Sequence, residues 1–209
     1  MDNYTPAQNM TDFFTHCYRK IKASRLFKVH FLGLFTLLFA VTVYAAASSL
    51  QIKTAELIAT NESYALHADF DLNLSAEVED ALSKGIPLTF LIEFQLLSPR
   101  KYWFDDEIIS ASSQVTLSYH ALSRQYLVNR NSHQQTFVSL QEAKEELSHL
   151  RDWQVLDKAL LKKGEIYHAG LRIRLDQSKL PKPLQVEALG SANWDMISER
   201  YHWTPAFVL

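Results

Sequence analysis

Cysteine is nearly absent from this chain of 209 residues, whose only thiol is Cys17. The residues that follow Cys17 therefore hold no disulfide, thiolate nucleophile, iron–sulfur cluster or Cys-ligated zinc. A domain formed by this part of the chain has to be stabilised by a hydrophobic core. At a length of roughly 160 residues, one domain buries about 70% of the surface that its unfolded chain exposes.

Glycine is also scarce, with five residues that are all isolated from one another. Loops that bind phosphate groups use clustered glycines, so a P-loop and a dinucleotide-binding fingerprint are excluded. Hydrolase motifs are missing too: there is no His-Glu-x-x-His and no Gly-x-Ser-x-Gly, and Ser98-Pro-Arg-Lys101 lacks the Ser-Asp-Asn and Lys-Thr-Gly partners of penicillin-binding enzymes. The sequence thus predicts no catalytic residue, no cofactor and no metal site, and an enzyme is the minority interpretation.

Neither sign of charge is in excess, since 21 Lys and Arg face 23 Asp and Glu and the sequence pI is near 6.4. A nucleic-acid-binding domain normally carries a clear excess of basic residues, so we expect no nucleic-acid partner. The charges are distributed unevenly along the chain. Residues 1–49 hold five basic and two acidic side chains, whereas the remaining 160 residues hold 16 basic and 21 acidic ones.

One long apolar run, Phe31–Ala47, contains seventeen residues and no charge. As a helix it would span roughly 26 Å, a little less than the hydrocarbon core of a membrane at about 30 Å. The five basic residues that precede it are typical of membrane targeting and unusual for a buried core helix. We therefore expect a basic cytoplasmic segment at 1–30, a hydrophobic helix at 31–47 and an exported domain at 48–209.

Two fates of the apolar helix stay open. Ala45-Ala46-Ala47 offers the small residues that signal peptidase needs, with Ser48 as the first mature residue. The polar segment before the helix is long for a signal peptide, which favours a retained single-pass anchor in the inner membrane. Both alternatives place domain 48–209 in the periplasm, because the basic end of such a helix stays in the cytoplasm.

Apolar and polar residues alternate along several segments of domain 48–209. The clearest segment is 63–74, and the same pattern is found at 88–96, 115–121 and 167–175. Shorter candidates lie at 50–58, 126–128, 136–138, 153–156 and 194–203. A period of two is typical of half-buried antiparallel strands, so the domain is expected to be mainly β.

Only two short helices are predicted. Ser75 caps the first, which has acidic residues in its first turn and Gly85 as its stop. Ser139 and Glu142 form a capping box for the second, which extends from about 140 to 151. The Pro181-Lys-Pro183 step is expected to be a rigid corner.

Many strands at short spacing, without a strand–helix–strand rhythm, favour an antiparallel β-sandwich. The segment 161–167 favours an immunoglobulin-like version, because it resembles a tyrosine corner, in which Tyr167 would bond back across the turn before its strand. A helical turn over 157–163 that ends at Gly164 explains the same residues, so this alternative stays open. The predicted fold is thus mainly β, with two short helices, preceded by the N-terminal hydrophobic helix.

Segment 100–107, with the sequence RKYWFDDE, is the densest concentration of recognition chemistry in the chain. Arg, Tyr and Trp anchor interfaces because they combine a large apolar area with a polar group. The candidate binding residues are Arg100, Tyr102, Trp103, Asp105 and Asp106. In the alternative interpretation, Tyr102 and Trp103 turn inward and plug one end of the sandwich while the charged residues stay solvated.

A second polar cluster, His67, Asp69 and Asp71, lies on one face of a predicted strand. These residue types can bind a divalent metal, but metal sites usually draw ligands from several elements, and a polar face is the ordinary exterior of an antiparallel sheet. We expect no metal there. Polar stripes of opposite charge, such as the one with Arg172 and Arg174, are expected to pair across neighbouring strands.

The order of several motifs resembles that of a bacterial family, DUF4390. The motifs are Arg100-Lys-Tyr102-Trp103, Leu117-Ser-Tyr119-His120, Tyr126, Tyr167, Leu171-Arg172, Leu175-Asp176, Leu180-Pro-Lys-Pro183 and Trp194 with Ser198, so the resemblance covers about residues 50–203. The family is catalogued as a domain of unknown function and is sometimes labelled proline-rich, although this chain has only six prolines. The resemblance implies an envelope protein of Gram-negative bacteria, often encoded beside a nitrogen-regulation-type sensor kinase. It supplies no catalytic residues.

We therefore expect a non-enzymatic domain that binds a protein partner in the cell envelope, for which a sensor kinase is a candidate, and that assists membrane signalling. The alternative is a periplasmic small-ligand-binding or hydrolytic protein whose site uses Arg100, Trp103, Asp105 and Asp106. A deep polar pocket with converging carboxylates favours the alternative, and a flat aromatic patch favours protein binding.

Overall fold

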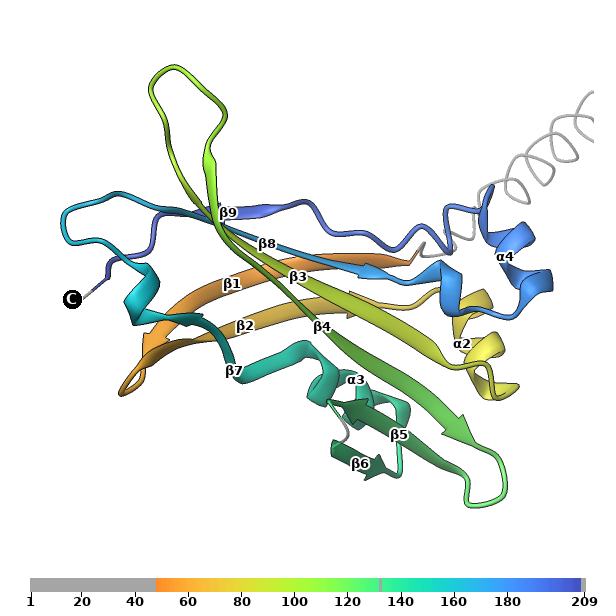
Figure 1. Ribbon diagram of the computed structural model, residues 1–209. Helices are drawn as coiled ribbons and strands as arrows, with labels where there is room; N and C mark the ends of the chain where they lie inside the picture. The colour runs from red at the N-terminus through yellow and green to blue at the C-terminus, as the bar shows by residue number, and fades with distance from the viewer. Residues whose placement is uncertain (1–47, 132, 208–209) are drawn as a thin grey trace, which may run out of the picture. The chain divides into compact units, whose positions relative to one another are not determined.

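Two antiparallel sheets contain about half of residues 48–131 and 133–207, the part of the chain that the computed structural model describes (Figure 1). The strand order is β1-β2-β7 in the smaller sheet and β6-β5-β4-β3-β8-β9 in the larger one. The prediction of a mainly β domain is confirmed. The predicted basic segment 1–30 and hydrophobic helix 31–47 lie outside the described residues.

The smaller sheet consists of β1 (Ser49–Ala59), β2 (Ser63–Asn73) and β7 (His149–Asp157). Its central strand, β2, follows the predicted alternation, because the apolar face from Tyr64 to Leu72 is buried while Asp71 and Asn73 are exposed. The pairing of β2 with β7 joins segments about eighty residues apart in sequence, with Asp69 opposite His149.

The larger sheet consists of β3 (Leu88–Ser98), β4 (Asp106–His120), β5 (Gln125–Arg130), β6 (His133–Phe137), β8 (His168–Leu175) and β9 (Tyr201–Trp203). On the inward face of β3 the apolar residues are wholly buried, as the alternation predicts, and they are Leu88, Phe90, Ile92, Phe94 and Leu96. Leu91 and Leu97, on the other face, are partly exposed. Strand β4 begins at Asp106, well before the predicted start at Val115. Strand β9 is shorter than predicted, but the residues before it still follow the edge of β8, with a bridge between Ile197 and Arg174.

The two predicted helices are α2 (Ala76–Ser83) and α3 (Leu140–Ser148). Ser75 and Ser139 cap them, each accepting a hydrogen bond from a main-chain N–H three residues later. Gly85, at φ +87°, ends α2 in a conformation that strains other residue types. Helix α3 ends before the predicted boundary, because Leu150 belongs to β7.

A third helix, α4 (Lys182–Ala188), corrects the prediction of a rigid corner at Pro181–Pro183. Proline fits the first turn of a helix, because the main-chain N–H that it lacks would have no hydrogen-bond partner within the helix there. Its fixed φ also suits the helical backbone. The described residues thus contain three α-helices, not two, together with short 3₁₀ turns at Lys158–Leu160 and Gln177–Lys179.

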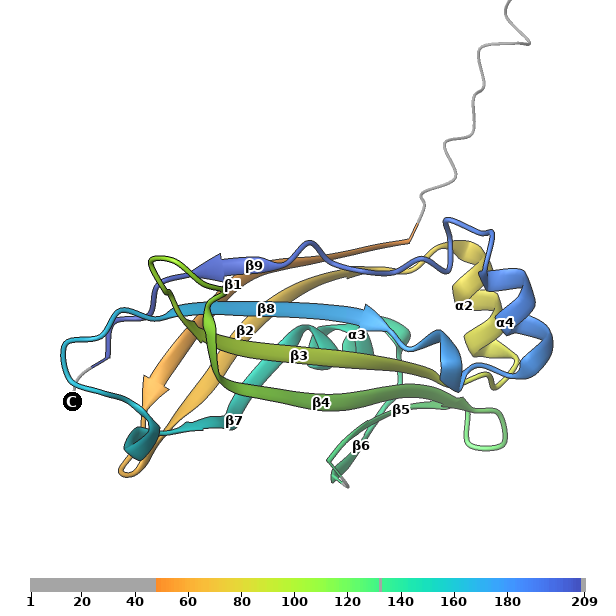
Figure 2. The ribbon, with the colours of Figure 1, turned by 45° about the horizontal axis from the view of Figure 1, so that its top comes forward.

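One hydrophobic core is shared by both sheets. Figure 2 shows α2 and α4 together at one end of the strands. Helix α3 contributes Ala143 and Leu147, which are fully buried, and it contacts strands of both sheets. The predicted tyrosine-corner hydrogen bond is present, since the Lys162 N–H donates to the Tyr167 hydroxyl at 2.9 Å, and that hydroxyl donates to Glu165 at 3.0 Å.

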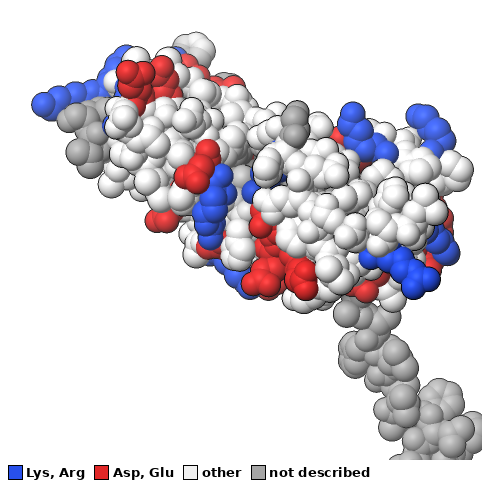
Figure 3. Space-filling model, turned by 90° about the horizontal axis from the view of Figure 1, so that it is seen from below, with Lys and Arg blue, Asp and Glu red and all other residues white. Residues whose placement is uncertain are grey.

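Within residues 48–131 and 133–207, no helix has the length and apolar character needed to span a membrane. Figure 3 shows one face of the molecule, where acidic and basic side chains are interspersed with uncharged surface. This mixed distribution agrees with the balanced composition of the chain.

Candidate functional site

The predicted binding residues lie in and beside the connection between β3 and β4. The two strands pair as far as Ser98 and Asp106, so residues 99–105 form the loop at the end of the hairpin, which we call the aromatic loop. Figure 1 shows the aromatic loop projecting away from the rest of the two sheets. At its tip the exposed fractions of Tyr102, Trp103 and Phe104 are 82%, 81% and 94%.

The interpretation of Tyr102 and Trp103 as a plug of the core is therefore wrong. The corresponding end of the core is filled by aromatic side chains from other segments. Phe207 packs edge-on against Tyr64 and Tyr167, with ring centroids 4.9 and 5.6 Å apart, and Trp203 packs against Phe94. The strand β3 is capped by these residues, and the aromatic loop is left free to project.

Charged residues lie at the base of the aromatic loop. The Arg100 guanidinium pairs with Asp106 at 2.5 Å, and the Arg100 main-chain N–H donates to the Asp105 carboxylate at 3.3 Å. The Arg100 and Asp106 side chains are each about half exposed, so this ion pair contributes little to stability. Its effect is geometric, because it links the two ends of the loop.

The five predicted residues thus divide into two groups. Arg100, Asp105 and Asp106 come together at the base of the loop, whereas Tyr102 and Trp103 lie at the tip. The Lys101 ammonium lies over the Tyr102 ring, 5.4 Å from its centroid.

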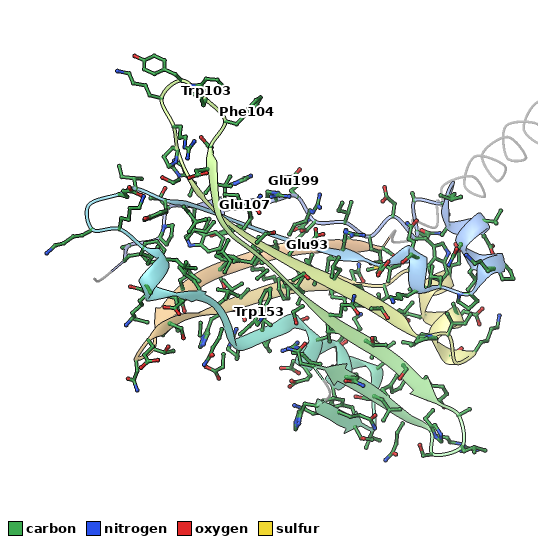
Figure 4. The ribbon with its side chains drawn as sticks, viewed as in Figure 1. Glu93, Trp103, Phe104, Glu107, Trp153 and Glu199 are labelled. Carbon is green, nitrogen blue, oxygen red and sulfur yellow. The ribbon has the colours of Figure 1, made fainter. Side chains whose placement is uncertain are left out.

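Phe104 was not among the predicted binding residues, although it lies next to Trp103 in the same motif. Figure 4 shows the side chains of Trp103 and Phe104 at the tip, away from Glu107 at the base. The adjacency of three aromatic residues between charged ones is the sequence signal that would have included it.

The polar stripe on β2 forms cross-strand pairs. Asp69 accepts hydrogen bonds from His149 at 2.7 Å and from Arg151 at 2.5 Å, both on β7, while Asp71 pairs with Lys53 on β1. In the part of the chain that the structure describes, no group of three His, Cys, Asp or Glu side chains is placed to hold a metal ion.

Asp69 provides a prediction of pH dependence. Hydrogen bonds from His149 and Arg151 lower the pKa of Asp69 from 3.8 to about 2. Because the folded-state pKa lies below the unfolded one, the stabilisation is present above about pH 4 and is lost as the pH falls toward 2. The side chain is 34% exposed, so we reduce the expected contribution to about 1 kcal/mol.

In the variant Asp69→Asn, we expect the free energy of unfolding to lose the pH dependence that the low pKa of Asp69 causes. Urea unfolding of the full-length chain between pH 2 and pH 5 measures it, and the gap in unfolding free energy between wild type and variant should shrink by about 1 kcal/mol toward pH 2. Asp71→Asn is the control for removal of one carboxylate from the same strand. A constant gap across this pH range would contradict the prediction.

The expected pairing of polar stripes is also found on the larger sheet. Arg172 donates twice to one carboxylate oxygen of Glu93, at 2.9 and 2.7 Å, and Arg174 approaches the other oxygen at 3.5 Å. Partial burial raises the pKa of Glu93, but the hydrogen bond and charge of Arg172, followed by those of Arg174, outweigh it, so the net pKa is lowered. These residues hold β3 against β8.

The comparisons with known proteins identify the family. A family model described as a domain of unknown function, DUF4390, matches residues 47–204. Because this match covers well over half of the chain, the chain belongs to the DUF4390 family, as its motifs predict. Neither the curated proteins nor the solved structures provide a significant match.

Proposed function

We propose that this member of the DUF4390 family is a non-enzymatic interaction domain of the cell envelope, which binds another protein through its aromatic loop. The observation that carries the proposal is the exposure of three consecutive aromatic side chains, Tyr102, Trp103 and Phe104, at the end of a projecting hairpin. Their burial in a partner would remove a large apolar area from water, and Tyr and Trp are the residues that most often dominate binding energy.

The arrangement at the base supports recognition of a partner more than chemistry on a small molecule. The residues of the alternative small-ligand or hydrolytic site do not converge, because Trp103 lies at the tip while Asp105 and Asp106 bind Arg100 at the base. A loop whose ends are linked loses less conformational entropy when it binds, which favours its use as a preorganised anchor.

The proposed location is the periplasmic side of the inner membrane, with either a retained anchor or a cleaved signal peptide. The uncharged segment Phe31–Ala47 and the basic residues before it support this location. The proposed partner is an envelope protein, and a sensor kinase that acts in membrane signalling is the first candidate.

We also infer that the two sheets pack as a β-sandwich. The shared hydrophobic core and the position of α3 between strands of both sheets support this arrangement. The hydrogen bond between Lys162 and Tyr167 is the feature that supports an immunoglobulin-like corner.

Capture of the partner tests the proposed function. The full-length chain in detergent would be immobilised and incubated with envelope extract, and the bound proteins identified by mass spectrometry. We expect a partner that wild type retains and that the triple variant Tyr102→Ser, Trp103→Ser, Phe104→Ser loses.

The matched control is Leu122→Ser, Val138→Ser, Leu189→Ser, which changes three side chains outside the aromatic loop that are 94%, 78% and 81% exposed. Recovery of the same proteins by wild type and both triple variants would contradict a binding role for the aromatic loop.

A further inference from the structure

The edges of the two sheets face each other across a groove. Strand β1 is the edge of the smaller sheet, and β9 with the residues before it forms the edge of the larger one. The first residues of β1 and the segment that leads into β9 lie close together, because both line one cavity. Between them lies a cavity of about 520 Å³, lined by residues 48–52 and by Asp195, Ile197, Glu199, Arg200 and Tyr201. We call it the β1–β9 groove.

The opposite side of the two sheets is closed. There α3 contacts β2 and β7 of the smaller sheet and β4, β5 and β6 of the larger one. The Arg130 guanidinium on β5 also donates to the main-chain oxygen of His149 on β7, at 2.8 Å. In the described residues, the β1–β9 side has no comparable helix: α2 and α4 lie at one end of the strands in Figure 2.

Apolar side chains along the open side are only partly covered. Ile52 and Leu57 of β1 and Trp203 of β9 pack against the core but are not buried, and Ile197 is 46% exposed. The outer edge of β1 has no strand partner among the described residues. An extended peptide placed along β1 would pair with its free main-chain groups and cover these side chains.

Residues 194–199 form the wall of the groove opposite β1, and buried and exposed side chains alternate along this wall. Trp194, Met196 and Ser198 point inward and are buried, whereas Asp195, Ile197 and Glu199 are exposed. Ser198 holds this wall in place, because its N–H donates to the Ile173 carbonyl at 2.9 Å and its hydroxyl accepts from the Ile173 N–H at 3.1 Å.

The wall carries a net negative charge, because it holds two acidic side chains, Asp195 and Glu199, and one basic side chain, Arg200. Asp195 and Glu199 form no ion pair with any described residue, and the neighbouring Arg200 donates to Gln95 at 2.7 Å. An acidic residue, an apolar residue and an acidic residue thus follow one another at every second position, about 6.6 Å apart along an extended chain.

We propose that the β1–β9 groove binds an extended segment of a partner protein, with a basic residue, an apolar residue and a basic residue at alternate positions. The segment adds to the edge of β1 through its main chain and places its basic side chains against Asp195 and Glu199. Residues 48–52 span roughly 17 Å, the length of five extended residues. This site shares no residue with the aromatic loop, so the two proposals fail or succeed separately.

Selection from a library tests this proposal. The probe is a phage-displayed library of random peptides of about ten residues, applied to the full-length chain in detergent. We expect enrichment of sequences with Lys or Arg at positions i and i+4 and an apolar residue at i+2. The double variant Asp195→Lys, Glu199→Lys should bind the enriched peptides at least about tenfold more weakly and select acidic residues at the same spacing.

The matched control is Glu62→Lys, Glu145→Lys, which makes the same charge change at exposed positions away from the groove. Urea unfolding shows whether each variant is folded. The proposal is overturned if wild type enriches no alternating basic sequence, or if the groove variant and the control select the same peptides. It is also overturned if sedimentation shows a dimer that the groove variant dissociates, because the occupant is then a second copy of the chain.

Discussion

Replacement of Trp103 with alanine is expected to weaken binding to the captured partner by about 30-fold, which corresponds to about 2 kcal/mol. The same variant should change the free energy of unfolding by less than about 0.5 kcal/mol, because surface substitutions remove few contacts from the folded state. The Trp103 side chain is 81% exposed at the tip of the aromatic loop, so its apolar area becomes buried only in a complex.

The two measurements are made on the same preparation. Titration of the partner gives the dissociation constant, and urea unfolding gives stability. Leu122→Ala is the control for loss of an exposed apolar side chain outside the loop, since Leu122 is 94% exposed. If Trp103→Ala destabilises the fold by more than about 2 kcal/mol, the loop packs on the domain. If affinity is unchanged, Trp103 is not the anchor.

The exposure of Trp103 could not be predicted from its neighbours in sequence. The apolar run of β3 ends just before the loop, and an apolar strand has to be covered at its end by something. The residues that cover it, Trp203 and Phe207, come from the C-terminal end of the chain, about one hundred residues away. Local pattern identifies which residues are capable of binding, but only the long-range packing decides which aromatic side chains remain outside.

The elements that the sequence predicted well are those whose signals are local. The alternation in β2 and β3 reflects burial of one face, and the caps Ser75 and Ser139 act within three residues of themselves. The first half of β4 gave no such signal, because segment 106–114 mixes serines with isoleucines on both faces. It is held in the sheet by its pairing with β3, which a single segment does not reveal.

The boundary between α3 and β7 and the presence of α4 were missed for different reasons. Leu150 continues the apolar stripe of α3 in sequence, yet it is buried as part of β7, where its partner Ala68 lies on β2. In α4, two prolines two residues apart suggested a break, although proline is compatible with the first turn of a helix. The β1–β9 groove was not predicted, because its two walls lie about 150 residues apart in sequence.

The alanine variant of Trp194 is expected to destabilise the chain by about 3 to 5 kcal/mol, in contrast to the same change at Trp103. Trp194 is 1% exposed, and its indole N–H donates to the Glu77 carboxylate on α2 at 2.6 Å. The neighbouring Asn193 amide donates to the other oxygen of Glu77 at 2.7 Å. The substitution would leave a cavity and remove one of the two donors to this carboxylate.

Two further variants separate these effects. Trp194→Phe keeps most of the volume and loses the N–H, so it should cost about 1.5 to 3 kcal/mol, the range for a hydrogen bond to a charged group. Trp103→Ala is the control, because it makes the same tryptophan-to-alanine change at an exposed position, whereas Trp194 is buried. Urea unfolding of the full-length chain measures the stability of Trp194→Ala, Trp194→Phe and Trp103→Ala. A loss of stability below about 1 kcal/mol in Trp194→Ala would mean that residues 194–203 are not part of the cooperative core. The acidic wall of the β1–β9 groove, which belongs to this segment, would then not be held rigid by the core.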